Sequence, residues 1–329
     1  STYCIKVRRV FNLLLQFGLL VEFISGTLLA VYFYFKFGPM GIYLGYWHAV
    51  SAFTNCGLDI MGANAGFAKM AADPFVSTVI VVTMFLGGVG FMAADDFLRH
   101  RSWSGLSLNS KLIFLMEAIL IPLGTIIFYN LEGNNPETLG GLSTMEKWQS
   151  AVLMSVSSRL GGFAVFDIHS MLDQTVLLVM MFMFIGAAPV STGGGIRTTT
   201  IGLLFLSLYA WIRGKKDVVI FHKHVDPDCL VKASNVFTLA VVITFITAFL
   251  VFVFEPMSFD FEDVMFEAVS AFSTVGFSMG LTGEWNTPCK IVLMIAMYIG
   301  RIGVMTLAIT FASHHSRQLK YPKENIIVG

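Results

Sequence analysis

The sequence predicts an all-α membrane protein made of pseudo-symmetric repeats. Each repeat is a transmembrane helix, a re-entrant pore helix with a filter loop, and a second transmembrane helix. Of the 329 residues, 56% are hydrophobic and only 13% are charged, whereas soluble domains carry about 25% charged residues. The apolar residues lie in runs long enough to cross a bilayer, and one short motif recurs three times between those runs. Together these observations predict the fold class.

Six apolar runs are the expected membrane spans, and most fit the roughly 20 residues that cross about 30 Å of hydrocarbon. One run, 172–211, would reach about 60 Å as a straight helix. Its middle, 186–200, holds a proline, four glycines and an arginine. We therefore expect two half-helices around a broken intramembrane loop, which is tolerated only where protein or a water-filled cavity surrounds it. The six runs are 10–35, 75–98, 112–129, 172–211, 231–254 and 291–311.

Basic residues concentrate on alternate connections between the spans, and acidic residues dominate the others. By the positive-inside rule the basic connections are cytoplasmic, which places both ends of this chain inside. The acidic connections would then concentrate cations on the outside. The basic set is Lys6, Arg8, Arg9, Arg99, Arg101, Lys111, Arg213, Lys215, Lys216, Lys223, Lys232, Arg317, Lys320 and Lys323.

A motif recurs in the three outer connections, each of which also holds a short apolar segment (46–53, 148–157 and 261–272). AVSAFTNCGL at 49–58 and AVSAFSTVGF at 268–277 share five leading residues and a glycine at the same offset. SVSSRLGGF at 155–163 is a weaker third copy. Their glycines, Gly57, Gly162 and Gly276, lie 105 and 114 positions apart (57 to 162 and 162 to 276). This spacing divides the chain into repeats at 1–105, 106–222 and 223–329.

Such a motif suits a cation filter. A short helix points its negative end at a cation, and an extended strand then aims backbone carbonyls at the ion to replace its hydration shell. Glycine permits the φ values that bring carbonyls to one side. The expected filter residues are Thr54, Asn55, Cys56, Gly57, Arg159, Leu160, Gly161, Gly162, Thr274, Val275 and Gly276.

At these motifs the chain resembles the membrane (pore) subunit of the Trk/Ktr/HKT superfamily of potassium transporters, and most of all its bacterial Ktr-type branch. The resemblance covers essentially the whole chain. It is carried by FEAVSAFSTVGFSMG (266–280), SVSSRLGGF (155–163), FIGAAPVSTGGGIRTTT (184–200), YIGRIGVMTLAITF (298–311) and the terminal YPKENIIVG.

Family members have four repeats around one pore, so the resemblance implies potassium at the carbonyls of Gly57, Gly162 and Gly276, with three of the four filter loops present. We therefore expect this chain to lack an N-terminal repeat of about 110 residues. Leu160 and Gly161 stand where the family usually has Thr and Ala, a departure that bears on fine selectivity.

The resemblance assigns the broken loop to an intramembrane gate whose expected residues are Gly186, Ser191, Thr192, Gly193, Gly194 and Gly195. A kinked helix without a gating role is the alternative. Arg301, inside the last span, would be a barrier to cations below the filter; its alternative is a salt bridge to a buried acid such as Glu117. We expect Arg159 to brace its filter loop through hydrogen bonds to nearby carbonyls, and Glu22 and Glu117 to serve packing.

The resemblance further implies uptake of K⁺ by channel-like permeation across the bacterial inner (plasma) membrane, a homodimer, and a cytoplasmic ring of nucleotide-binding (RCK-type) regulatory subunits. Na⁺ would be an activator, and no organic cofactor is expected on this chain. The zero net charge suggests no nucleic-acid partner. Three alternatives remain: a sodium-permeable member, an intramembrane enzyme using His48 or Cys56, and a non-conducting paralogue. The four scattered cysteines form neither zinc spacing nor a disulfide framework.

Overall fold

A computed structural model describes residues 2–61, 67–215, 217–255 and 259–306. Over these residues helix is the main secondary structure, and one two-stranded hairpin links α9 to α10. The elements are α1 (Thr2–Phe37), α2 (Met40–Phe53), α3 (Ala68–Ala71), α4 (Pro74–Gly88), α5 (Phe91–His100), α6 (Leu108–Glu132), α7 (Thr144–Ser157), η1 (Ile168–Ser170), α8 (Asp173–Phe184), α9 (Thr198–Ile212), β1 (Val219–Ile220), β2 (Lys223–His224), α10 (Pro227–Phe254), α11 (Phe261–Ser273), η2 (Leu281–Gly283) and α12 (Thr287–Ile302).

Long apolar helices confirm the expected all-α membrane fold. Within the described residues, α1, α6 and α10 are each long and apolar enough to cross a membrane, and α4 with α5 makes a fourth span if the bent pair is counted as one. The run 172–211 is divided into the short helices α8 and α9 around an irregular segment, as expected. The end of the last expected span, 307–311, lies outside the described residues.

The second expected span, 75–98, is not one helix. The chain turns by 96° between α4 and α5. The turn occurs at Gly90, whose φ of 87° favours glycine, and the amide of Phe91 donates a hydrogen bond to Val190 O of the irregular segment instead of continuing the helix. Three glycines at 87–90 are the sequence signal for this break.

Helix starts follow local capping chemistry. Asp73 and Asp226 precede Pro74 and Pro227, and their side chains accept amide hydrogen bonds from the first turns of α4 and α10. At α7, Ser143 and Glu146 form a reciprocal capping box. These signals fix where the helices begin.

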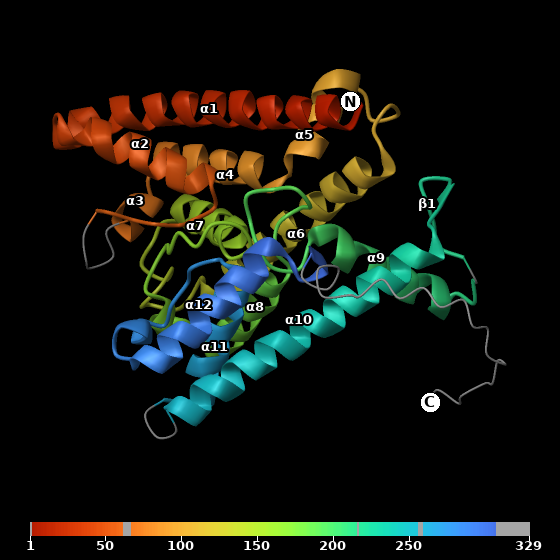
Figure 1. Ribbon diagram of the computed structural model, residues 1–329. Helices are drawn as coiled ribbons and strands as arrows, with labels where there is room; N and C mark the ends of the chain where they lie inside the picture. The colour runs from red at the N-terminus through yellow and green to blue at the C-terminus, as the bar shows by residue number, and fades with distance from the viewer. Residues whose placement is uncertain (1, 62–66, 216, 256–258, 307–329) are drawn as a thin grey trace.

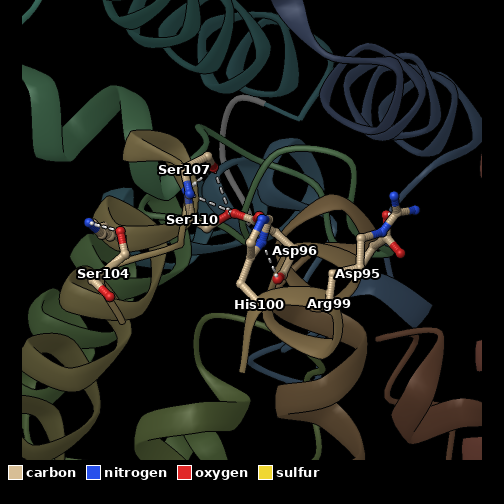
Figure 2. Close-up of polar contacts among 8 residues, drawn as sticks. Asp95, Asp96, Arg99, His100, Ser104, Ser107 and Ser110 are labelled. Carbon is tan, nitrogen blue, oxygen red and sulfur yellow. Dashed lines mark hydrogen bonds and ion pairs between the residues drawn. The ribbon is translucent and has the colours of Figure 1, made fainter. Parts of the chain in front are cut away.

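A polar corner fastens α5 to α6 (Figure 2). The Asp96 carboxylate accepts hydrogen bonds from the Ser107 amide (2.8 Å) and the Ser110 hydroxyl (2.6 Å), and it pairs with His100 Nδ1 at 2.9 Å. Asp95 and Arg99 form an ion pair on the same helix, one turn apart. The corner sets the direction in which α6 leaves α5.

The short helices α2, α7 and α11 occupy the middle of the molecule. α1 lies along one side of them and the long α10 along the other (Figure 1). α4 packs on both α2 and α7, and α8 packs on α11, so each second span of a repeat also contacts the short helix of the next. This packing brings the loops that follow the three short helices together.

Candidate functional site

The three short helices end in the same way. Cys56 N, Gly162 N and Val275 N donate to the carbonyls of Ser51, Ser157 and Ser270, five residues earlier, at 3.0, 3.0 and 3.2 Å. A bond of this span closes a helix and turns the chain sharply away from its axis. Loop 1 (54–58), loop 2 (158–163) and loop 3 (274–277) therefore leave their helices with a common geometry.

Left-handed residues then set the course of each loop. In loop 1 they are Asn55 (φ 53°) and Gly57 (φ 68°), and in loop 3 they are Thr274 (φ 53°) and Gly276 (φ 96°). Alternate left-handed residues turn successive carbonyls toward one side of a strand. Loop 2 is one residue shorter between the aligned serine and glycine, and of its residues only Gly162 is left-handed (φ 59°).

The loops meet one another at these glycines. An ideal Cβ added to Gly57 would lie inside 3.0 Å of the Gly161 carbonyl oxygen, and one added to Gly162 would lie inside 3.0 Å of the Val275 carbonyl oxygen. At Gly276 the nearest atom to such a Cβ is the carbonyl oxygen of Cys56, at 3.5 Å. Loop 1 thus contacts loop 2, loop 2 contacts loop 3, and loop 3 approaches loop 1, with main-chain oxygens at each junction.

The carbonyls of the loops fall into two groups. Those directly after the filter glycines are held by their own helices: Ser157 Oγ donates to Phe163 O (2.8 Å), Ser270 Oγ donates to Phe277 O (2.6 Å), and Trp47 Nε1 donates to Leu58 O (3.2 Å). Within the described part of the chain, six carbonyls at or next to the three glycines accept no hydrogen bond: Cys56, Gly57, Gly161, Gly162, Val275 and Gly276. This second group is available to a cation.

Other expected filter residues have local roles. Thr54 bonds back to Val50 O at 2.7 Å, and Cys56 is exposed with a free thiol. Leu160 is buried and packs on the backbone of Gly88.

Arg159 does not brace its loop through carbonyls. It is buried, and its guanidinium forms two parallel hydrogen bonds to the Glu117 carboxylate of α6, at 2.7 and 3.0 Å. The prediction of carbonyl contacts was wrong because the carboxylate of Glu117, on the preceding long helix, reaches the same site and binds both terminal nitrogens of the guanidinium. The alternative that paired Glu117 with Arg301 is excluded by the same contact.

The irregular segment 185–197 lies against the ends of two short helices. The Thr192 hydroxyl donates to two carbonyl oxygens, Phe53 O (2.9 Å) and Gly87 O (3.0 Å). It accepts a hydrogen bond from Asn55 Nδ2 at 2.8 Å. On the other side, a Cβ on Gly194 would collide with the Thr274 hydroxyl and approach Ser273 O at 3.0 Å. The segment is therefore in contact with both loop 1 and loop 3.

The segment is also bonded to itself and to α4. Gly186 packs on the Gly194 carbonyl, and Gly193 on the Ala187 side chain. Ser191 Oγ donates to Ala188 O at 2.6 Å. The amide of Ala188 in turn donates to Gly88 O of α4 at 3.0 Å. All six residues expected to form the gate thus lie in one packed segment that contacts loops 1 and 3.

Two arginines lie near this segment. Arg197 donates to Gly193 O at 2.7 Å and lies close enough to Arg301 for the two positive charges to repel. Arg301 is exposed, near the end of α12. In α12 the neighbouring Gly300 packs directly on the carbonyl of Phe272, so the backbone of α12 lies close to the end of α11 at this point.

Acidic residues gather at the start of α11. Burial, followed by the negative charges of Asp173, Asp263 and Asp260, raises the pKa of Glu262. No group of three or more His, Cys, Asp or Glu side chains is placed to hold a metal ion in the described residues.

Three polar side chains lie next to the loops; sequence reasoning named His48 only for the enzyme alternative and missed Asp59 and Glu267. His48 and Glu267 occupy the same position of the repeated motif, directly before its first alanine, and Asp59 lies two residues after Gly57. His48 contacts Asp59 at 3.0 Å, while Glu267 accepts from Ser278 and Met279. Their equal offsets from the glycine were the signal that could have identified them.

The fold and the site define a multi-pass membrane protein in which three helix-terminal loops present backbone carbonyls to one another. A model of the TrkH family, described as cation transport protein, matches residues 5–320. The chain belongs to this family, whose members are transporters and not enzymes.

Known relatives agree with this assignment. The chain is 32% identical to Ktr system potassium uptake protein B of Vibrio alginolyticus over 99% of this chain and 71% of the relative, and 32% identical to potassium/sodium uptake protein NtpJ of Enterococcus hirae over 96% and 71%. The crystal structure of the potassium transporter TrkH from Vibrio parahaemolyticus superposes with a TM-score of 0.68 at 17% identity, covering 89% of this chain and 63% of that one. That likeness concerns the fold alone.

Proposed function

We propose that this chain belongs to a potassium uptake protein and conducts K⁺ through a filter of backbone carbonyls. The observation that carries the proposal is the meeting of loops 1, 2 and 3 at Gly57, Gly162 and Gly276, with carbonyls that have no hydrogen-bond donor among the described residues. Such oxygens can replace the hydration shell of an ion as it passes. The α2, α7 and α11 helices act as pore helices whose negative ends face the ion.

Relatives favour potassium as the transported ion. The Vibrio alginolyticus relative is named a potassium uptake protein, and the Enterococcus hirae relative a potassium/sodium uptake protein. The chain spans about 63% of the solved TrkH structure, so the activity is proposed for the whole protein to which this chain belongs. Sodium permeation is the second candidate, and the second relative's name supports it. Glycine at all three filter positions favours potassium.

In this proposal the segment 185–197 is the gate. It contacts loop 1 through Thr192 and loop 3 through Gly194, so its displacement would open the path leading away from the filter. Arg301 would raise the barrier for cations next to it, because a nearby positive charge repels them.

The surroundings of the pore are proposed from the relatives and the charge pattern. The basic connections would face the cytoplasm of a bacterial inner membrane, and a nucleotide-binding regulatory subunit would dock there, since several relatives are named as parts of a Ktr system. A homodimer and activation by Na⁺ belong to the same proposal.

The test is ion flux in liposomes containing the purified full-length protein. We expect Rb⁺ to enter faster than Na⁺, and Gly276→Ser to reduce that preference by at least about tenfold, because a side chain in the left-handed region shifts the carbonyls. Gly141→Ser is the matched control, since Gly141 has open space around it. An unchanged preference in Gly276→Ser would refute the filter assignment, and a faster Na⁺ flux in the unmodified protein would select the sodium candidate.

A further inference from the structure

In two of the three loops, a polar side chain of the short helix contacts a polar side chain that follows the glycine, at matching positions of the repeat. The first pair is His48 and Asp59, which we call brace 1. The second is Glu267 and Ser278, which we call brace 3. In each, a helix residue nine positions before the filter glycine contacts a residue two positions after it. Each brace therefore spans its whole loop.

Brace 1 is built around a fully buried imidazole. His48 Nδ1 lies 2.7 Å from Leu44 O and Nε2 lies 3.0 Å from Asp59 Oδ1. Each ring nitrogen therefore has an acceptor oxygen within hydrogen-bond distance. Asp59 also accepts from the amides of Met61 and Phe67, both at 2.7 Å. The chain on the far side of Gly57 is thereby fixed to α2.

The ring of His48 also reaches the neighbouring loop. Its centroid lies 6.3 Å from the ring of Phe163, which directly follows Gly162, and 6.0 Å from the stacked ring of Phe67. A movement of brace 1 would therefore disturb loop 2 as well as loop 1, because interiors packed at this density transmit small displacements.

Brace 3 also ties the chain after its glycine to the short helix, but here the helix residue is the hydrogen-bond acceptor. Glu267 is 5% exposed, and its Oε1 accepts from Ser278 Oγ at 2.6 Å and from Met279 N at 3.0 Å, while Oε2 accepts from Thr282 at 3.1 Å. The helix residue donates in brace 1 and accepts in brace 3. In loop 2 the corresponding positions are the apolar Met154 and Ala164.

We infer that braces 1 and 3 are positioning residues that determine ion selectivity, by fixing the carbonyls of loops 1 and 3 at the spacing that a dehydrated K⁺ requires. The inference rests on the proposed function. A carbonyl filter discriminates between ions only if its oxygens keep their spacing, and among the described residues the carbonyls of Gly57 and Gly276 themselves accept no hydrogen bond. The braces join a side chain before the glycine to a side chain after it, in addition to the bonds from Trp47 to Leu58 O and from Ser270 to Phe277 O.

The two braces can be exchanged, since they occupy equivalent positions. In the full-length protein, His48→Glu alone places a glutamate carboxylate against the carboxylate of Asp59. His48→Glu combined with Asp59→Ser gives loop 1 the glutamate–serine pair of brace 3. The readout is the K⁺/Na⁺ permeability ratio, taken from the reversal potential under opposed K⁺ and Na⁺ gradients. We expect the single variant to lower the ratio by at least about tenfold, because a buried charged group left unpaired is costly, and the double variant to return it to within about threefold of the unmodified value.

The reciprocal exchange, Glu267→His with Ser278→Asp, gives an independent copy of the test, and Met154→Leu changes the same position in loop 2 as a control. Should His48→Glu fail to fold, the double variant decides: a folded double variant with restored ratio supports the inference, and one with a lost ratio overturns it. Equal ratios in the single, double and unmodified proteins also overturn it. If the unmodified protein conducts neither ion, it is the proposed function that fails.

Discussion

Loops 1 and 3 differ from loop 2 in how they are supported. Loops 1 and 3 each have two left-handed residues, and in each a side chain of the short helix is hydrogen-bonded to a side chain after the glycine. Loop 2 has one residue fewer between the aligned serine and the glycine and has one left-handed glycine, and its arginine is bonded to Glu117 of α6. Loops that follow the same helix ending are therefore supported by different side-chain contacts. What the repeat preserves is the helix ending and the glycine, while the supporting contacts vary.

The largest expected effect comes from removing the support of loop 2. Glu117→Ala leaves the Arg159 guanidinium buried without a carboxylate, and breaking a buried pair from one side costs about 3–5 kcal/mol. We expect a large loss of thermal stability in detergent, measured by the temperature of unfolding.

Two further variants serve as references for this measurement. Asp95→Asn, which breaks the more exposed pair with Arg99, should cost less than about 1 kcal/mol. Glu117→Leu combined with Arg159→Met removes both charges and should recover part of the loss. Equal stability of Glu117→Ala and Asp95→Asn would contradict the view that loop 2 depends on this pair.

The second prediction concerns the contacts between loops. Gly57→Ala and Gly162→Ala drive a methyl group into a carbonyl oxygen of the next loop, whereas Gly276→Ala meets its nearest neighbour at 3.5 Å. We expect the first two to reduce Rb⁺ uptake by at least about tenfold and Gly276→Ala by less, since strain of the left-handed residue alone is of order 1–3 kcal/mol. Similar losses in all three would argue that the close approach is not what matters.

The third prediction separates loops 1 and 3 by their contact with the segment 185–197. Thr192→Val removes the hydroxyl that joins Phe53, Gly87 and Asn55, bonds worth about 0.5–1.5 kcal/mol each. If the segment is the gate, Rb⁺ uptake should rise several-fold. Thr78→Val, which removes only a bond within α4, is the control, and lower uptake in a folded Thr192→Val protein would count against the gate.

The smallest effect is expected where loops 2 and 3 are alike. Ser157→Ala and Ser270→Ala each remove one hydroxyl bond to the carbonyl after the filter glycine. Each should cost about 1 kcal/mol of stability and change Rb⁺ uptake to a similar, small extent. A large difference between the two would show that this part of the repeat is not equivalent.

The sequence by itself determined the membrane fold, the three short helices and the glycines. The composition, the apolar runs and a motif repeated at constant offset are local properties, and helices form from local hydrogen bonds. The run 172–211 was predicted to break because its glycines and proline are adjacent in the chain. The same reasoning applied to the glycines at 87–90 would have found the turn between α4 and α5.

Only the tertiary structure decided the partners of the polar side chains. Arg159 and Glu117 are 42 positions apart, and Asn55 and Thr192 are 137 apart. No local pattern selects such pairs, because several acids and hydroxyls compete for each donor until the helices pack. The packing of α4 on α7 and α8 on α11 brings the three loops to one place, and their carbonyls become a site only there.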